Sequence, residues 1–196
     1  SAANSLVGNT ANDRVGGGGV TALSNGNYVV LSPGWDNGAT SDVGAVTWGS
    51  GATGIAGIVS AANSLVGSKN SDQVGYGDPG VTALSNGNYV VHSYKWDSGG
   101  VADVGAVTWG NGTTGITGVV TVSNSLVGST AYDQIGITGD PDGGAMPDPG
   151  VTALSNGDYV VHSPRWDNGG ATDAGAVTWG SGTTGVTGVV TVTNSL

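Results

Sequence analysis

The chain has 196 residues, 39 of them glycine, and a formal net charge of −10 at pH 7. This charge disfavours nucleic acid and anionic lipid as partners, because affinity for polyanions comes mainly from lysine and arginine side chains, of which there are four. No apolar run reaches the roughly 20 residues that cross a bilayer, and no basic-then-apolar leader follows Ser1, so we expect no membrane insertion. Helix formers are scarce, which favours an all-β protein.

One segment occurs three times along the chain. Val-Thr-Ala-Leu-Ser-Asn-Gly-Asn-Tyr-Val-Val begins at Val20, returns 61 residues later at Val81 and, with Asp in place of one Asn, 70 residues after that at Val151. A unit that recurs in this way is a supersecondary module that buries its apolar face against its neighbours. We place repeats at residues 4–62, 63–123 and 124–193, with 194–196 beginning a further outer strand.

Each repeat predicts four antiparallel strands, which in the first copy follow in chain order. Residues 19–23 alternate in polarity, and Asn25-Gly26 predicts a type I′ hairpin turn. The return strand at 28–31 is rich in β-branched residues and should be central. After a long loop, 44–48 forms the third strand and 58–66 the fourth.

The outer-strand sequence Asn-Ser-Leu occurs four times, beginning at Asn4, Asn63, Asn124 and Asn194, whereas the other strands occur three times. The additional copy of this strand sequence is consistent with a segment of a longer array of repeats. It equally fits a ring in which the N-terminal segment pairs with the last repeat and removes an exposed edge.

The repeat contains Asp-Gln-Val-Gly at 72–75, the Asn-Gly turn, Val-Val-His-Ser-Pro-Arg-Trp-Asp-Asn-Gly at 160–169 and Gly-Ala-Val-Thr-Trp at 175–179. With these parts it resembles the FG-GAP type of β-propeller blade found in integrin-like heads and bacterial surface proteins. It also resembles repeats of filamentous-haemagglutinin-like bacterial exoproteins. The resemblance implies propeller-like blades and a secreted, surface-exposed bacterial protein.

A closed propeller typically needs about four to eight blades, and three repeats are too few. The array therefore continues, or several chains assemble, or the repeats close a threefold β-prism. A β-solenoid is a further alternative.

The sequence departs from the FG-GAP pattern at the loop where that family binds calcium. Here the loop is Ser24-Asn25-Gly26-Asn27, and Asp158 is the one acid at an equivalent position. Calcium takes about six to eight oxygen ligands, so we do not carry the site over and expect no cofactor. An insertion within 137–148 contains three weak candidates for Ca²⁺ ligands, which are Asp140, Asp142 and Asp148.

A Trp-Asp pair occurs in the long loop of every repeat. An aromatic ring can stack on a sugar while the adjacent carboxylate accepts hydroxyl hydrogen bonds, which makes these pairs candidate carbohydrate ligands. The alternative interpretation is that each tryptophan fixes its loop to the sheet. The residues are Trp35, Asp36, Trp96, Asp97, Trp166 and Asp167.

The other recurring residues predict structural roles. The strand tryptophans alternate with valine at period two and should pack in the core. The histidines replace Leu31, which argues against catalysis and for a half-buried or strand-edge position. The remaining recurring aspartates should accept hydrogen bonds from turn amides. These groups are Trp48, Trp109 and Trp179; His92 and His162; and Asp13, Asp42, Asp72, Asp103, Asp133 and Asp173.

The sequence contains no cysteine, no glutamate and no phosphate-binding or nucleophile-elbow motif, so we expect no enzymatic activity. We predict a non-enzymatic structural or adhesive repeat segment of a secreted bacterial surface protein, which presents loops or self-assembles. The partners would then be neighbouring repeats or chains. The alternative is a multivalent lectin that binds glycans through its Trp-Asp loops.

Overall fold

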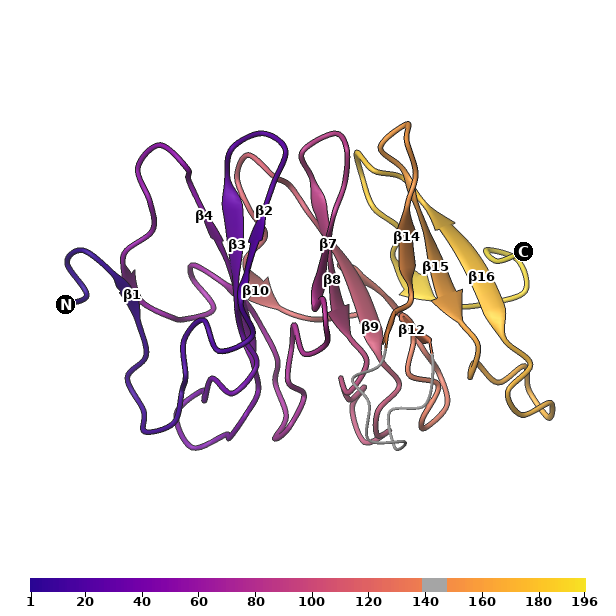
Figure 1. Ribbon diagram of the computed structural model, residues 1–196. Helices are drawn as coiled ribbons and strands as arrows, with labels where there is room; N and C mark the ends of the chain where they lie inside the picture. The colour runs from indigo at the N-terminus through magenta and orange to yellow at the C-terminus, as the bar shows by residue number, and fades with distance from the viewer. Residues whose placement is uncertain (139–147) are drawn as a thin grey trace.

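The computed structural model describes residues 1–138 and 148–196 and shows an all-β protein, as predicted. Three main sheets follow one another from the N-terminus to the C-terminus, each with a face turned toward the next, and the termini lie at opposite ends of the stack (Figure 1). The described strands form no closed ring or barrel. Among these same residues, no helix has the length and apolar character needed to cross a membrane.

Sheets 1 and 2 each contain five strands. In sheet 1, β2, β3, β4 and β6 are antiparallel neighbours, and β10 adds to β6 in parallel. Sheet 2 repeats this arrangement, with β17 as its parallel strand. The bounds in sheet 1 are β2 Val20–Ala22, β3 Tyr28–Ser32, β4 Ala45–Gly49, β6 Leu65–Val66 and β10 Gly118–Val119; in sheet 2 they are β7 Val81–Ala83, β8 Tyr89–Ser93, β9 Ala106–Gly110, β11 Ser125–Val127 and β17 Gly188–Val189.

Sheet 3 has three described antiparallel strands, β14 Val151–Ala153, β15 Tyr159–Ser163 and β16 Ala176–Gly180. Two smaller pairs complete the described strands. Strand β1 (Leu6–Val7) lies parallel to β5 (Gly57–Ile58), and β12 (Ile137–Thr138) lies antiparallel to β13 (Asp148–Pro149).

The prediction of a single fourth strand over 58–66 is wrong. The chain turns between β5 and β6, where Asn63 accepts a hydrogen bond from the Ser60 N–H at 2.9 Å and donates to the Ile58 carbonyl at 2.9 Å. Strand β5 pairs with β1, whereas β6 joins sheet 1. Sheet 1 therefore takes β6 and β10 from the second repeat, and sheet 2 takes β11 and β17 from the third. Sheets 1 and 2 are therefore mixed rather than four-stranded and antiparallel, and their limits along the chain differ from the repeat limits at 62/63 and 123/124.

The predicted hairpin after β2 is present, but its turn is not type I′. A type I′ turn needs a positive φ at both central residues, whereas here Gly26 has a φ of 86° and Asn25 is not among the positive-φ residues. Bonds from the Gly26 N–H to the Leu23 carbonyl and from the Leu23 N–H to the Asn27 carbonyl close a three-residue loop. This is the type I turn with a following left-handed residue that longer hairpins use.

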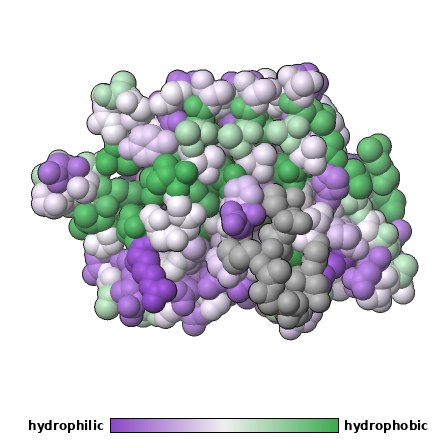
Figure 2. All heavy atoms as spheres, in the orientation of Figure 1, coloured by the Kyte–Doolittle hydropathy of each residue, from purple (hydrophilic) through white to green (hydrophobic). Residues whose placement is uncertain are grey.

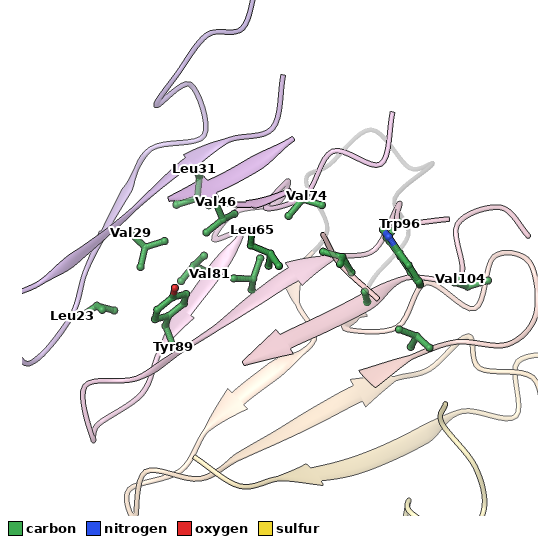
Figure 3. Packing of buried hydrophobic residues seen from close by; sticks show 14 residues of the cluster. Leu23, Val29, Leu31, Val46, Leu65, Val74, Val81, Tyr89, Trp96 and Val104 are labelled. Atoms are coloured by element: carbon green, nitrogen blue, oxygen red, sulfur yellow. The ribbon is translucent and has the colours of Figure 1, made fainter. Parts of the chain in front are cut away.

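The core lies between the sheets, because alternate residues of each strand point to opposite faces. We call the face toward the N-terminal end proximal and the opposite face distal. The distal side of sheet 1, with Leu31 and Val46 (Figure 3), packs on the proximal side of sheet 2, with Tyr89 and Val91. A second cluster joins sheets 2 and 3, and a third lies under β1. Burying each large apolar side chain contributes about 1.5–3 kcal/mol, so these clusters hold the stack together.

Candidate functional site

The loop tryptophans of the Trp-Asp pairs lie inside the protein. Trp35, Trp96 and Trp166 are 3%, 5% and 6% exposed and belong to the three apolar clusters. Their indole nitrogens make no hydrogen bond within the described residues, so apolar packing holds the rings. A sugar needs an exposed ring face, and these rings offer none. The prediction of a carbohydrate site at Trp35, Trp96 and Trp166 is therefore wrong, and the alternative of loop-fixing tryptophans is confirmed.

The adjacent aspartates are engaged in the same loops. The Asp36 carboxylate accepts the Asp42 backbone N–H at 2.7 Å, and the Asp97 and Asp167 carboxylates accept the equivalent amides of Asp103 and Asp173. The residues that donate these N–H groups have φ values of 47–49°, so the bond stabilises a backbone conformation that L-residues rarely adopt. These carboxylates shape the loop, which the prediction for Asp36, Asp97 and Asp167 as glycan ligands did not anticipate.

A second aspartate in each repeat anchors the Trp-Asp loop to the preceding turn. Asp72 Oδ2 accepts the Ser68 and Lys69 N–H groups at 2.7 and 2.8 Å, and its Oδ1 accepts the Asp97 N–H at 3.0 Å. Asp13 and Asp133 make the same three bonds. Burial raises the pKa of the Asp72 carboxyl above its usual value, and the three backbone donors partly offset this rise. The predicted role of Asp13, Asp72 and Asp133 as acceptors of turn amides is confirmed.

The weak calcium candidates lie largely outside the described residues. Asp140 and Asp142 fall there, and Asp148 begins β13 with only its backbone described. The described residues hold no cluster of three or more His, Cys, Asp or Glu side chains that suits a metal ion.

The histidines occupy matching positions on β8 and β15. Each ring Nε2 lies within hydrogen-bond distance of a threonine hydroxyl on the neighbouring strand, Thr82 at 2.9 Å for His92 and Thr152 at 3.0 Å for His162. His162 is half-buried, as predicted, whereas His92 is fully buried between sheets 2 and 3. Burial lowers the pKa of His92 to about 4, so the ring is neutral at physiological pH.

The strand tryptophans prove to be junction residues, a role that the sequence did not reveal. The Trp48 indole N–H donates to the Gly112 carbonyl of the next repeat at 2.9 Å, and Trp109 donates to the Gly182 carbonyl at 3.0 Å. Trp48 and Trp109 are half-buried against the clusters, in partial agreement with the expected core position. Trp179, the third member, is 52% exposed, so the core prediction is wrong there.

Two asparagines join each tryptophan at the junction. The side-chain amides of Asn25 and Asn27 both donate to the Gly112 carbonyl at 2.8 Å, so three side chains of the first repeat converge on one oxygen of the second. Asn86, Asn88 and Trp109 converge in the same way on Gly182. The Asn-Gly loop therefore serves to connect repeats as well as to turn the chain.

A shallow groove crosses the same edge of the stack. The facing ends of β2, β7 and β14 line it with equivalent Ala-Leu-Ser segments at 22–24, 83–85 and 153–155. The lining carries no charged group, so the groove offers shape and hydroxyl groups but no acid–base chemistry.

Comparison with known proteins gives a family without an assigned function. A scan against protein-family models matches the family described as a repeat of unknown function (DUF5650) at residues 1–17, 22–76, 83–137 and 153–196. A search of the curated proteins found no match. The FG-GAP and haemagglutinin-like resemblances stay predictions. The four matches cover most of the chain, and the last three each begin in the first strand of a main sheet, so the chain belongs to this family of repeats.

Proposed function

We propose that the chain is a non-enzymatic structural repeat segment whose sheets form one continuous, rigid stack that holds loops at regular spacing. The observation that carries this proposal is strand sharing. Sheet 1 contains β10 from the end of the second repeat, and sheet 2 contains β17 from the end of the third. Neither the second nor the third repeat can leave the stack without taking two strands from the preceding sheet.

The junction bonds support the same function. Because Gly112 and Gly182 each accept three side-chain donors from the preceding repeat, rotation of one sheet against the next would break several bonds at once. The free energy of unfolding of such an array is approximately the sum of a contribution from each repeat and a contribution from each interface between neighbouring repeats. The shared strands and the junction bonds make the interface contribution large here.

The described site residues favour a structural over a catalytic role. Their carboxylates accept backbone N–H groups in every repeat, whereas a catalytic pair would lie in one asymmetric cleft. Presentation of the long loops along one edge of the stack is consistent with an adhesive surface protein. Secretion and the bacterial surface location remain part of the proposal and rest on the sequence resemblance.

Two measurements on the full chain test the proposal. Urea unfolding followed by tryptophan fluorescence and by circular dichroism should give one coincident transition, because the repeats share strands. Small-angle X-ray scattering should give an elongated particle whose profile matches the stack of Figure 1. Three separate transitions, or a profile of independently moving modules, would overturn the proposal.

A further inference from the structure

The same pair of faces meets at both internal junctions. On one side stand a strand tryptophan and two loop asparagines from the distal face of a sheet, and on the other stands the carbonyl of a loop glycine of the next repeat. A second glycine makes room for the indole, since a Cβ on Gly115 would lie 2.7 Å from Trp48 Cβ. Gly185 stands in the same relation to Trp109.

Each of the two faces that meet at an internal junction also occurs once at an end of the stack. There it has no partner face among the described residues. The distal face of sheet 3 exposes Trp179, and apolar surface gathers at this C-terminal end (Figure 2, right). At the other end, Gly51 and Gly54 are the equivalents of Gly112 and Gly115. Val20 is 63% exposed there, whereas its equivalents Val81 and Val151 are 1% and 6% exposed under a preceding sheet.

We propose that the distal face of sheet 3 is a docking surface for the proximal end of a second copy of this chain. In the complex the Trp179 indole N–H donates to the partner's Gly51 carbonyl, as Trp48 does to Gly112 within the chain. The partner's Gly54 receives the indole ring, and its Val20 becomes buried. This inference rests on the proposed stacking function and names its partner. The contact is head to tail, so it leads to chains of copies rather than closed pairs.

The small pair β1–β5 supports this occupant. It is the counterpart of the pairs β6–β10 and β11–β17, which complete sheets 1 and 2. A docked copy would add its β1–β5 pair beside β16 and complete sheet 3. Its residues 4–6 would replace 194–196, which are of the same types and are held by the Leu196 N–H to the Val177 carbonyl and the Ser195 to Thr178 hydroxyl contact. Since Leu196 is 94% exposed, this exchange removes no buried side chain.

Asp158 restrains this association. It replaces Asn27 and Asn88 of the other repeats and keeps their bond to a backbone amide, here the Gly182 N–H at 2.9 Å. A carboxylate has no hydrogen to donate to a partner carbonyl, and its second oxygen accepts the Asn156 amide at 2.8 Å. Two of the three junction donors are thereby lost, and a negative charge faces the incoming carbonyl.

Asp158→Asn is therefore the decisive variant, because it should strengthen association. Sedimentation velocity over a concentration series should show a dissociation constant at least about tenfold lower than that of the unaltered chain, since two donors return to the junction. Adding Trp179→Ala to this variant should restore the monomer. Adding Tyr132→Ala instead should change nothing, because Tyr132 is an equally exposed aromatic residue outside the two end faces.

A mixing experiment tests the head-to-tail direction. Asp158→Asn with Trp179→Ala has an impaired distal face but an intact proximal face. Asp158→Asn with Gly54→Ala has the reverse, because the added methyl group would meet the incoming indole. Each protein alone should stay monomeric, and the mixture should form one-to-one dimers. No dimer in the mixture would overturn the direction, and no gain with Asp158→Asn would overturn the docking surface.

Scattering from dilute samples of the same variants separates this inference from the proposed function. If the docking inference alone fails, each variant still gives the single-chain profile of a rigid stack and one unfolding transition. If the stack itself fails, the single-chain profile changes regardless of association.

Discussion

The backbone of Gly115 lies directly against the side chain of Trp48, so that a Cβ on Gly115 would come within 2.7 Å of Trp48 Cβ and 3.1 Å of Cγ. The two residues belong to different repeats, and the indole of Trp48 is bonded to Gly112 three positions away. This contact fixes the distance between sheets 1 and 2 at the hairpin edge. It makes the glycine as important to the junction as the tryptophan.

Gly115→Ala should lower the free energy of unfolding by about 2–4 kcal/mol, because the methyl group displaces the indole and the residue has a positive φ. Urea unfolding of the full chain measures this change. Gly99→Ala is the matched control, since Gly99 also has a positive φ of 63° but nothing lies within 4 Å of its Cβ. Equal losses in the two variants would show that backbone strain, not the junction contact, accounts for the effect.

Trp96→Ala should lower the free energy of unfolding by about 3–5 kcal/mol, the usual range for a large buried aromatic residue. The exposed Trp179 provides the control, because Trp179→Ala removes a ring that is largely in water and should change the stability of the monomer little. Thermal unfolding at low protein concentration compares the two. A Trp96 variant as stable as the Trp179 variant would contradict the buried placement of the loop tryptophans.

His92→Leu should reduce the loss of stability on acidification. The folded-state pKa of about 4 lies below the unfolded value near 6.5, so the neutral ring contributes stability above pH 6.5 that is lost as the pH falls toward 4. The free energy of unfolding that His92 contributes, and that is lost over this pH range, is about 3 kcal/mol. Leu31 occupies the same position in the first repeat, which shows that the site accommodates leucine.

Unfolding free energies at pH 7.0, 5.5 and 4.0 provide the measurement. The His92→Leu variant should show a flatter pH profile than the unaltered chain over this range, and His162→Leu should have a smaller effect because His162 is half-buried. Identical profiles for the unaltered chain and the His92 variant would remove His92 as the origin of acid sensitivity.

Thr108→Val should destabilise the protein by about 1–2 kcal/mol. Thr108 Oγ1 and Ser125 Oγ are buried and lie 2.7 Å apart, so the variant loses this buried hydrogen bond, and Ser125 Oγ keeps only its bond to Asn124 Oδ1 at 2.9 Å. The same pair recurs as Thr178 and Ser195, where Ser195 is half-buried and reaches water. Thr178→Val is therefore expected to cost less, and an equal cost in chemical denaturation would argue against the role of burial.

The sequence predicts the strands correctly where local chemistry decides them. The alternating residues of β2 to β4 and the Asn-Gly loop give the hairpin in every repeat, because pleat and turn preferences act over neighbouring residues. The turn type was wrong because the Asn-Gly dipeptide alone does not fix the loop length: the Leu23 N–H bonds to the Asn27 carbonyl, which makes a three-residue loop in which the glycine is the residue with a positive φ. The third repeat has the same loop, although its Asn156 amide donates to Asp158 and not to another repeat, so contacts between repeats do not select the turn type.

Residues 57–66 show where local reasoning fails. The run has strand-forming residues at both ends, yet β5 and β6 lie in different sheets because each finds its partner far away in the sequence. Likewise, Trp35 and Trp48 carry the same side chain in similar surroundings, and only packing places the first in the core and the second at the junction. No local signal distinguishes a tryptophan that fixes a loop from one that could meet a ligand.

By itself the sequence determined the repeat, the all-β class and the positions of the hairpin turns, since these follow from composition, from alternation and from hydrogen bonds between near neighbours. The tertiary structure alone decided which strands share a sheet, which tryptophans are buried and which carbonyls the junction side chains meet. Those properties depend on contacts between residues about 60–100 positions apart, and a pattern read along one chain does not contain them.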